Sequence, residues 1–172
     1  TTEIYTLSLH DALPISRKFL LEQGESFTIY RTLIDLLALP ESHPAVKQAK
    51  KELLRDPLVL WMLDHLSDWE NDTFSGHDKP DYLPNQIWLL LDWGLTPDDE
   101  PRIRKACEQM LNRQDKDSGQ FLAHSWVYDG KTKEKYAAWT SAMCDHLIIV
   151  SVLALAGYIE DPRLQRGFDR VQ

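Results

Sequence analysis

One sequence pattern recurs three times along the chain: the apolar end of a helix, a short turn, and a proline that begins a more polar segment. The prolines that mark the repeats are Pro44, Pro101 and Pro162. Proline is favoured in the first turn of a helix, because the N–H group that it lacks would have no partner there. Gly94 and Gly157 permit the left-handed backbone that often ends a helix. Each repeat is therefore predicted to be a pair of helices joined by a turn.

The two helices of each pair differ in polarity. A helix that is apolar on all sides must be covered on all sides, whereas an amphipathic helix faces solvent. Apolar first helices are expected at 27–39, 84–93 and 139–158, and amphipathic second helices at 44–55, 101–113 and 162–171. Side chains near the helix starts are expected to cap them, namely Ser42, Asp99 and Asp161.

A further helix is expected at 56–66, with Asp56 as its cap and Pro57 at its first position. No segment alternates between apolar and polar residues for long enough to predict a sheet. The predicted fold is therefore all-α, with an inner layer of apolar helices wrapped by an outer layer of amphipathic helices.

The composition is that of one ordinary domain, with 172 residues, 43% of them hydrophobic and 27% charged. It excludes the collagen-like, low-complexity and disulfide-rich classes. The two cysteines, Cys107 and Cys144, are expected to be free thiols of a cytoplasmic protein. A net charge of -8 and the lack of a Lys/Arg block argue against nucleic-acid binding. The longest apolar run, 147–156, is too short for a transmembrane helix.

Residues 1–16 resemble the translation of a sequencing adapter. The adapter codons give every residue of 1–15 in order. The segment lacks the basic start and the continuous apolar core of a signal peptide. We therefore expect a non-native segment at 1–16, disordered or incidentally helical, followed by the authentic domain at 17–172.

The segment 114–121, QDKDSGQF, is similar to the Gln-x-x-x-Gly-x-Trp motif of squalene and hopene cyclase repeats, with Phe121 in place of tryptophan. The turn at 155–164 is similar to the connection between inner and outer helices in those repeats. Over 19–172 the chain thus resembles the α/α-toroid superfamily of terpenoid cyclases and protein prenyltransferases. The motif ties neighbouring hairpins together there, so Asp115 and Asp117 are expected to accept backbone N–H groups in a tight turn.

A complete toroid holds more than the three or so helical hairpins found here. The resemblance therefore implies a partial toroid, truncated at both ends, whose uncovered apolar faces make self-association the expected behaviour. It also implies an isoprenoid or other apolar ligand in a central cavity. The Asp-x-Asp-Asp acid of class II cyclases does not occur in the sequence. Two functions stay open: a cyclase-like or prenyltransferase-like enzyme, and a non-catalytic toroid that binds a lipid, a peptide or a partner protein.

The polar segment 77–81 is the first candidate site. His77 and Asp81, together with the distant Asp145, are candidate catalytic residues, and Asp78 is a candidate metal ligand. An imidazole and carboxylates in one short segment can bind a divalent metal or exchange a proton. The alternative is a polar loop in which Asp81 caps the next helix.

The second candidate site is the run Cys144, Asp145, His146. An Asp, a Cys and a His hold zinc in protein prenyltransferases, so the resemblance implies that Cys144 and His146 bind zinc, with magnesium as the other candidate. Residues two apart on a helix point about 200° away from each other. Cys144 and His146 can therefore share one ion only if the helix begins later than predicted.

Three aromatic residues are candidates for lining a substrate: Trp126, Tyr128 and Trp139. The first two lie in the segment that leads into the third apolar helix, and Trp139 opens that helix. The negative face of an aromatic ring can stabilise a positively charged intermediate.

Overall fold

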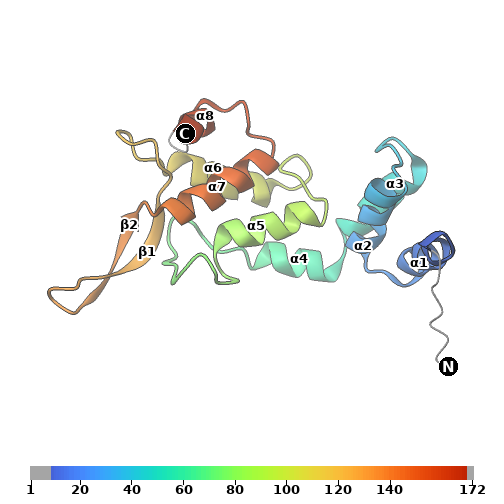
Figure 1. Cartoon of the computed structure of the whole chain (residues 1–172), viewed down its shortest axis with the longest axis horizontal. Coiled ribbons are helices and arrows are strands. Elements are labelled where there is room, and N and C mark those ends of the chain that lie inside the picture. The colour runs from blue at the N-terminus through green and yellow to red at the C-terminus, as the bar shows by residue number, and fades with distance from the viewer. Residues whose placement is uncertain (1–8, 170–172) are drawn as a thin grey trace, which may run out of the picture. The chain divides into compact units, whose positions relative to one another are not determined.

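The computed structural model describes residues 9–169 and divides them into two compact units, one ending at Leu60 and the other beginning at Trp61 (Figure 1). Of the predicted non-native segment, residues 1–8 lie outside the described part of the chain. The rest belongs to helix α1, Leu9–Gln23, which runs on into the predicted authentic domain.

The first unit is built from α1, α2 (Ser26–Arg31), the π-helical turn η1 (Thr32–Leu36) and α3 (Pro44–Leu53). Helix α2 packs against α3. The ammonium group of Lys50 lies 4.9 Å from the centre of the buried Tyr30 ring. The hydroxyl of Ser26 donates to Asp56 at 2.7 Å, and Asp56 also accepts the Leu58 N–H at the start of α4, Pro57–Asp64.

The second unit packs three helices, α5 (Leu83–Asp92), α6 (Pro101–Asn112) and α7 (Met143–Leu155), against one another. Helix α8 (Pro162–Asp169) packs against α7. The core between these helices is apolar, and its fully buried members include Ile87, Leu90, Ile103, Met110, Ile149, Val152 and Leu164.

A β-hairpin precedes α7, and it corrects the predicted all-α fold. Strand β1, Ala123–Tyr128, pairs antiparallel with β2, Lys135–Thr140, so that Trp126 faces Ala137. Within residues 9–169 this makes the protein a mixture of helices and a two-stranded sheet. The prediction of an all-α partial toroid is therefore wrong, because the helix predicted from Trp139 is a strand up to Thr140.

The hairpin is favoured by local sequence features that lie next to strongly helical segments. Alternate residues of β1 are aromatic, and the turn begins with Asp129 and Gly130, a favoured turn pair. The Asp129 carboxylate accepts the N–H of Lys131 at 2.7 Å and closes the turn. The backbone of Phe74 pairs with β1 beside Ser125, so one edge of the hairpin is partly covered.

The helices predicted to begin at prolines are confirmed, although two of their caps differ from the prediction. Asp161 caps α8 as predicted, since it accepts the Arg163 N–H at 2.8 Å. His43 and Glu100, rather than Ser42 and Asp99, accept the first N–H groups of α3 and α6. Each lies directly before its proline and so is one residue closer to the free N–H groups.

The segment 114–121 links α6 to α8. The amide of Gln114 donates to the carbonyls of Gly119 and Arg163, each at 2.8 Å. Asp115 accepts the Ser118 N–H at 2.7 Å, as predicted for a tight turn. The motif therefore holds structural elements together through Gln114 and closes its own turn through Asp115.

His146 completes this link from inside the core. Its Nδ1 accepts the Phe121 N–H at 3.0 Å, which leaves Nε2 to donate to the Gly167 carbonyl at 3.1 Å. A Cβ on Gly167 would lie 2.8 Å from the Phe121 ring, so α8 rests directly on that ring. One fully buried imidazole thus joins α7, the turn after α6, and α8.

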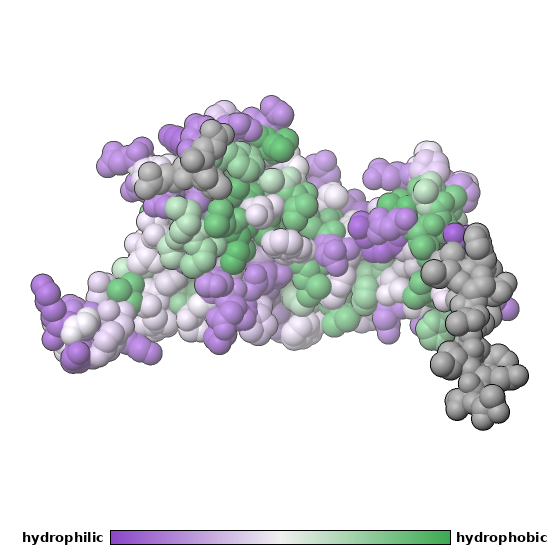
Figure 2. Space-filling view, viewed as in Figure 1, coloured by the Kyte–Doolittle hydropathy of each residue, from purple (hydrophilic) through white to green (hydrophobic). Residues whose placement is uncertain are grey.

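Apolar side chains also reach the surface over α5 and α7 (Figure 2). On α7 the exposed members are Met143, Leu147 and Leu155, and on α5 they are Trp88 and Leu89. Helix α7 is thus apolar on all sides but covered on only part of its circumference. Among the described residues, no helix combines the length and the apolar character needed to cross a bilayer.

Replacing His146 by leucine should destabilise the second unit by about 3 kcal/mol, because a buried N–H and a buried carbonyl lose their partners. The free energy of unfolding can be measured with urea. His65→Leu is the matched control, and as an exposed substitution it should cost less than about 1 kcal/mol. An equal, small effect of both substitutions would contradict the linking role of His146.

Candidate metal centre

Three side chains with metal-binding atoms converge at the start of α7: His77, Cys144 and Asp145. One ligand atom from each lies within 4.8 Å of the other two. His77 comes from the loop before α5, whereas Cys144 and Asp145 lie in the first turn of α7. Because α5 packs against α7, two segments far apart in sequence meet at this point (Figure 1).

The loop that carries His77 is fixed by the helix that follows it. Asn85, in the first turn of α5, donates to the backbone carbonyls of His77 at 2.7 Å and of Lys79 at 3.0 Å. Side chain to backbone bonds of this kind replace the regular bonding that a loop lacks. The His77 imidazole is therefore presented to α7 on an anchored backbone.

The two site residues in the first turn of α7 differ in their exposure to solvent. Cys144 is exposed and Asp145 is buried, with 8% of its surface accessible. The N–H groups at a helix start carry partial positive charge, which favours a carboxylate there. The side chain of His77 remains 44% exposed, so solvent or a ligand can approach the cluster from the His77 and Cys144 side.

Burial dominates the electrostatics of Asp145. Removal from water raises the pKa of this carboxyl above its ordinary value, while His77 and Tyr82 act in the opposite direction. The His77 Nδ1 lies 3.5 Å from the Asp145 carboxylate. A cation held beside Asp145 would offset the penalty of keeping this carboxylate ionised in a buried place.

Tyr82, directly before α5, lies behind Asp145. Its hydroxyl interacts with the carboxylate but lacks the alignment of a hydrogen bond, and it has no other partner among the described residues. Burial first, and then the negative charge of Asp145, raise the pKa of Tyr82, so the hydroxyl keeps its proton. The ring packs against Phe74 and Trp69, with centroids 5.4 Å and 5.8 Å away.

The donor set indicates the kind of metal. An imidazole nitrogen, a thiolate and a carboxylate together match zinc, which accepts nitrogen, sulfur and oxygen ligands. Magnesium prefers oxygen ligands alone, so Cys144 argues against it. Three protein ligands also leave a fourth position of a tetrahedral ion for water or a substrate atom, as in catalytic zinc sites.

Three predicted site residues lie elsewhere. The exposed Asp78 pairs with Lys79 at 2.9 Å, and Asp81 is exposed, with its backbone carbonyl accepting the Ser67 hydroxyl. His146 uses both ring nitrogens in the core. The three residues that do meet, His77, Cys144 and Asp145, come from two different predicted groups, and the sequence pattern predicts no role for Tyr82.

The three aromatic residues predicted to line a substrate lie in two different environments. Trp126 and Tyr128 project from the hairpin, more than half exposed. Trp139 is half-buried, with the Arg113 guanidinium 4.5 Å from one of its faces and His124 against it at 5.2 Å. It also touches Trp69, so it belongs to the aromatic cluster behind Tyr82.

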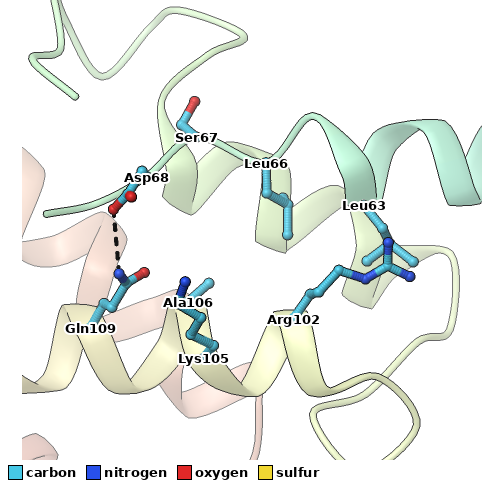
Figure 3. Close-up of a pocket in the computed structure, with 8 residues that line it drawn as sticks. All are labelled: Leu63, Leu66, Ser67, Asp68, Arg102, Lys105, Ala106 and Gln109. Carbon is cyan, nitrogen blue, oxygen red and sulfur yellow. Dashed lines mark hydrogen bonds between the residues drawn. The ribbon is translucent and has the colours of Figure 1, made fainter. Parts of the chain in front are cut away.

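A hollow of about 200 Å³ lies on the other side of α6, between its N-terminal half and the segment after α4 (Figure 3). Two of its charged groups have protein partners: Arg102 pairs with Asp64 and Glu100, and Asp68 accepts from Gln109 at 3.3 Å. Within the described part of the chain, the hollow holds no cluster of metal-binding side chains like the one at the start of α7, so we do not place the site there.

The chain matches no family model, no curated protein and no solved structure.

The two thiols should differ sharply in reactivity. Cys107 is fully buried, and burial raises its pKa to about 12, whereas Cys144 is exposed. At pH 8 an alkylating reagent should modify Cys144 at least about 100-fold faster, because Cys107 reacts only when the structure opens. Mass spectrometry of the labelled peptides measures both rates. Similar rates in the folded protein, with equal rates in urea as the control, would contradict the placement of Cys107.

Proposed function

We propose that His77, Cys144 and Asp145 bind one zinc ion and that this centre acts on an apolar substrate of the isoprenoid class. The observation that carries the proposal is the convergence of three ligand atoms of zinc-binding type within 4.8 Å of one another. The burial of Asp145 supports it, since a buried carboxylate needs a positive partner. The resemblance to protein prenyltransferases, which hold zinc through the same three residue types, supports it further.

The three residues would have different roles in such a centre. Cys144 and Asp145 supply two negative ligands from one rigid helix turn, and His77 adds a neutral ligand from the anchored loop. Zinc in a site of this kind lowers the pKa of a coordinated water or thiol to near neutrality. The open side lies toward solvent at His77 and Cys144, where a nucleophile can enter.

The exposed face of α7 supports an apolar substrate. Cys144, Leu147, Ser151 and Leu155 lie three or four residues apart and share one face of the helix. Leu147 is 40% and Leu155 is 60% exposed. A hydrocarbon chain laid along this face would remove apolar surface from water and bring one end to Cys144.

The zinc site bears on the cellular compartment of the protein, and the exposed apolar face of α7 bears on its self-association. Zinc binding requires a reduced Cys144, so we place the protein in a reducing compartment, the cytoplasm. Without a ligand, the apolar side chains of α5 and α7 would favour self-association.

A second candidate function is non-catalytic binding of a partner protein or a peptide. It is favoured by the hairpin, whose Trp126, Tyr128 and Tyr136 are each at least half exposed. Aromatic side chains of this kind are enriched in protein interfaces. This function becomes the better account if the zinc-loaded protein binds no isoprenoid diphosphate.

The metal-free protein should bind one equivalent of Zn²⁺, measured by competition with a chromophoric chelator. Cys144→Ser should weaken the affinity by more than about 100-fold, because loss of a ligand exceeds the effect of losing a supporting residue. In the cobalt-substituted protein the same change should remove the thiolate-to-cobalt charge-transfer band.

Cys107→Ala is the matched control for that experiment, since it removes the other thiol and should leave both readouts unchanged. Wild-type protein that binds no zinc, or a Cys144→Ser variant that binds as well as wild type, would overturn the proposed metal centre.

Leu147→Asp should weaken the binding of farnesyl diphosphate by about ten- to hundredfold, the contribution of one buried leucine, and leave zinc affinity unchanged. Calorimetry measures both affinities, with inorganic diphosphate as the ligand that lacks the hydrocarbon. Ile159→Asp is the control, because Ile159 is half exposed but follows the far end of α7. Equal binding to both variants would place the lipid elsewhere.

A further inference from the structure

We propose that Tyr82 is a positioning residue of the metal centre, whose hydroxyl donates a hydrogen bond to the Asp145 carboxylate when that carboxylate holds the cation. This inference rests on the proposed zinc site and assigns that site a fourth member. Metal-ligating groups are commonly held by a second layer of hydrogen bonds, which orients them and raises metal affinity.

The first argument is the burial of an unsatisfied donor. Only 1% of the Tyr82 surface is accessible, and its hydroxyl has no aligned hydrogen bond among the described residues. Buried hydroxyl groups are almost always paired, so an unpaired one points to a partner supplied in another state of the site. The group with which this hydroxyl interacts is the Asp145 carboxylate, although without the geometry of a hydrogen bond.

The second argument is that the surroundings fix the position of Tyr82 from two sides. Its ring is held edge-on by Phe74 and Trp69, with interplanar angles of 89° and 62°. Its backbone N–H donates to Lys79 at 3.1 Å, and its carbonyl accepts the Asn85 N–H at 2.9 Å at the start of α5. The position of the phenol is therefore fixed by the packing of its ring and by the hydrogen bonds of its backbone.

The third argument concerns which group donates the hydrogen bond and which group accepts it. A phenol hydroxyl can donate to one carboxylate oxygen while the other oxygen binds the metal. A carboxylate held in this way binds through a single oxygen, which preserves the fourth position of a tetrahedral ion. Tyr82 thus acts through Asp145 and need not touch the metal or the substrate.

A functional role and a structural role predict opposite effects of Tyr82→Phe. The substitution removes a hydroxyl that has no aligned partner in the metal-free protein, so the metal-free midpoint of thermal unfolding should stay the same or rise slightly. Zinc affinity should nevertheless fall by about 10- to 100-fold, the usual effect of losing a supporting hydrogen bond to a ligand.

The experiment compares wild type, Tyr82→Phe and the control Tyr136→Phe, which removes an exposed hydroxyl from β2. Zinc affinity is measured by chelator competition, and stability by thermal unfolding without metal. The visible spectrum of the cobalt-substituted protein is the third readout, because ligand-field bands change when a carboxylate changes from one to two bound oxygens. The control should match wild type in all three, and Tyr82→Phe should change the affinity and the cobalt bands.

Two outcomes would overturn the role of Tyr82 while the metal centre stands. One is wild-type zinc affinity in Tyr82→Phe. The other is a fall in affinity that is matched by a lower unfolding midpoint of the metal-free variant, with unchanged cobalt bands, which assigns the residue to packing. Wild-type protein that binds no zinc would overturn the metal centre itself, and Tyr82 with it.

Discussion

The packing of α5 against α7 is the contact on which the candidate site depends. Buried aliphatic residues on both helices, Ile87 and Leu90 on one and Ile149 and Val152 on the other, belong to the core between them. This contact brings the loop before α5 to the first turn of α7. Without it, His77 and Cys144 would be separated by more than sixty residues of chain and would have no reason to meet.

Helix α7 serves the core and the site at the same time, because successive residues on a helix point about 100° apart. His146 points into the core and joins two other segments with both ring nitrogens. Cys144, two residues earlier, is exposed on the side that carries the apolar stripe. The buried Asp145 lies between these two directions and connects the interior with the site.

The interior behind the site is aromatic, and this explains why Asp145 is electrostatically unusual. Trp69, Phe74, Tyr82 and Trp139 form one aromatic cluster, in which Tyr82 meets Phe74 and Trp69 edge to face and interacts with Asp145. A carboxylate placed against such a cluster loses hydration and gains in return the His77 imidazole at 3.5 Å and an imperfectly aligned hydroxyl. The hairpin contributes to this environment, since it supplies Trp139 and fixes where α7 begins.

The sequence by itself determined the helices that begin at prolines, the glycine-bearing helix ends and the tight turn at Asp115, because each depends on neighbours a few residues away. It also pointed to His77, Cys144 and Asp145, although in different groups. The hairpin was missed, since its alternating strand is short and lies beside strongly helical segments. Only the tertiary structure decided that His77 faces Cys144 and Asp145 while His146 faces the core, because that choice depends on where α7 starts and on which of its sides α5 and α8 cover.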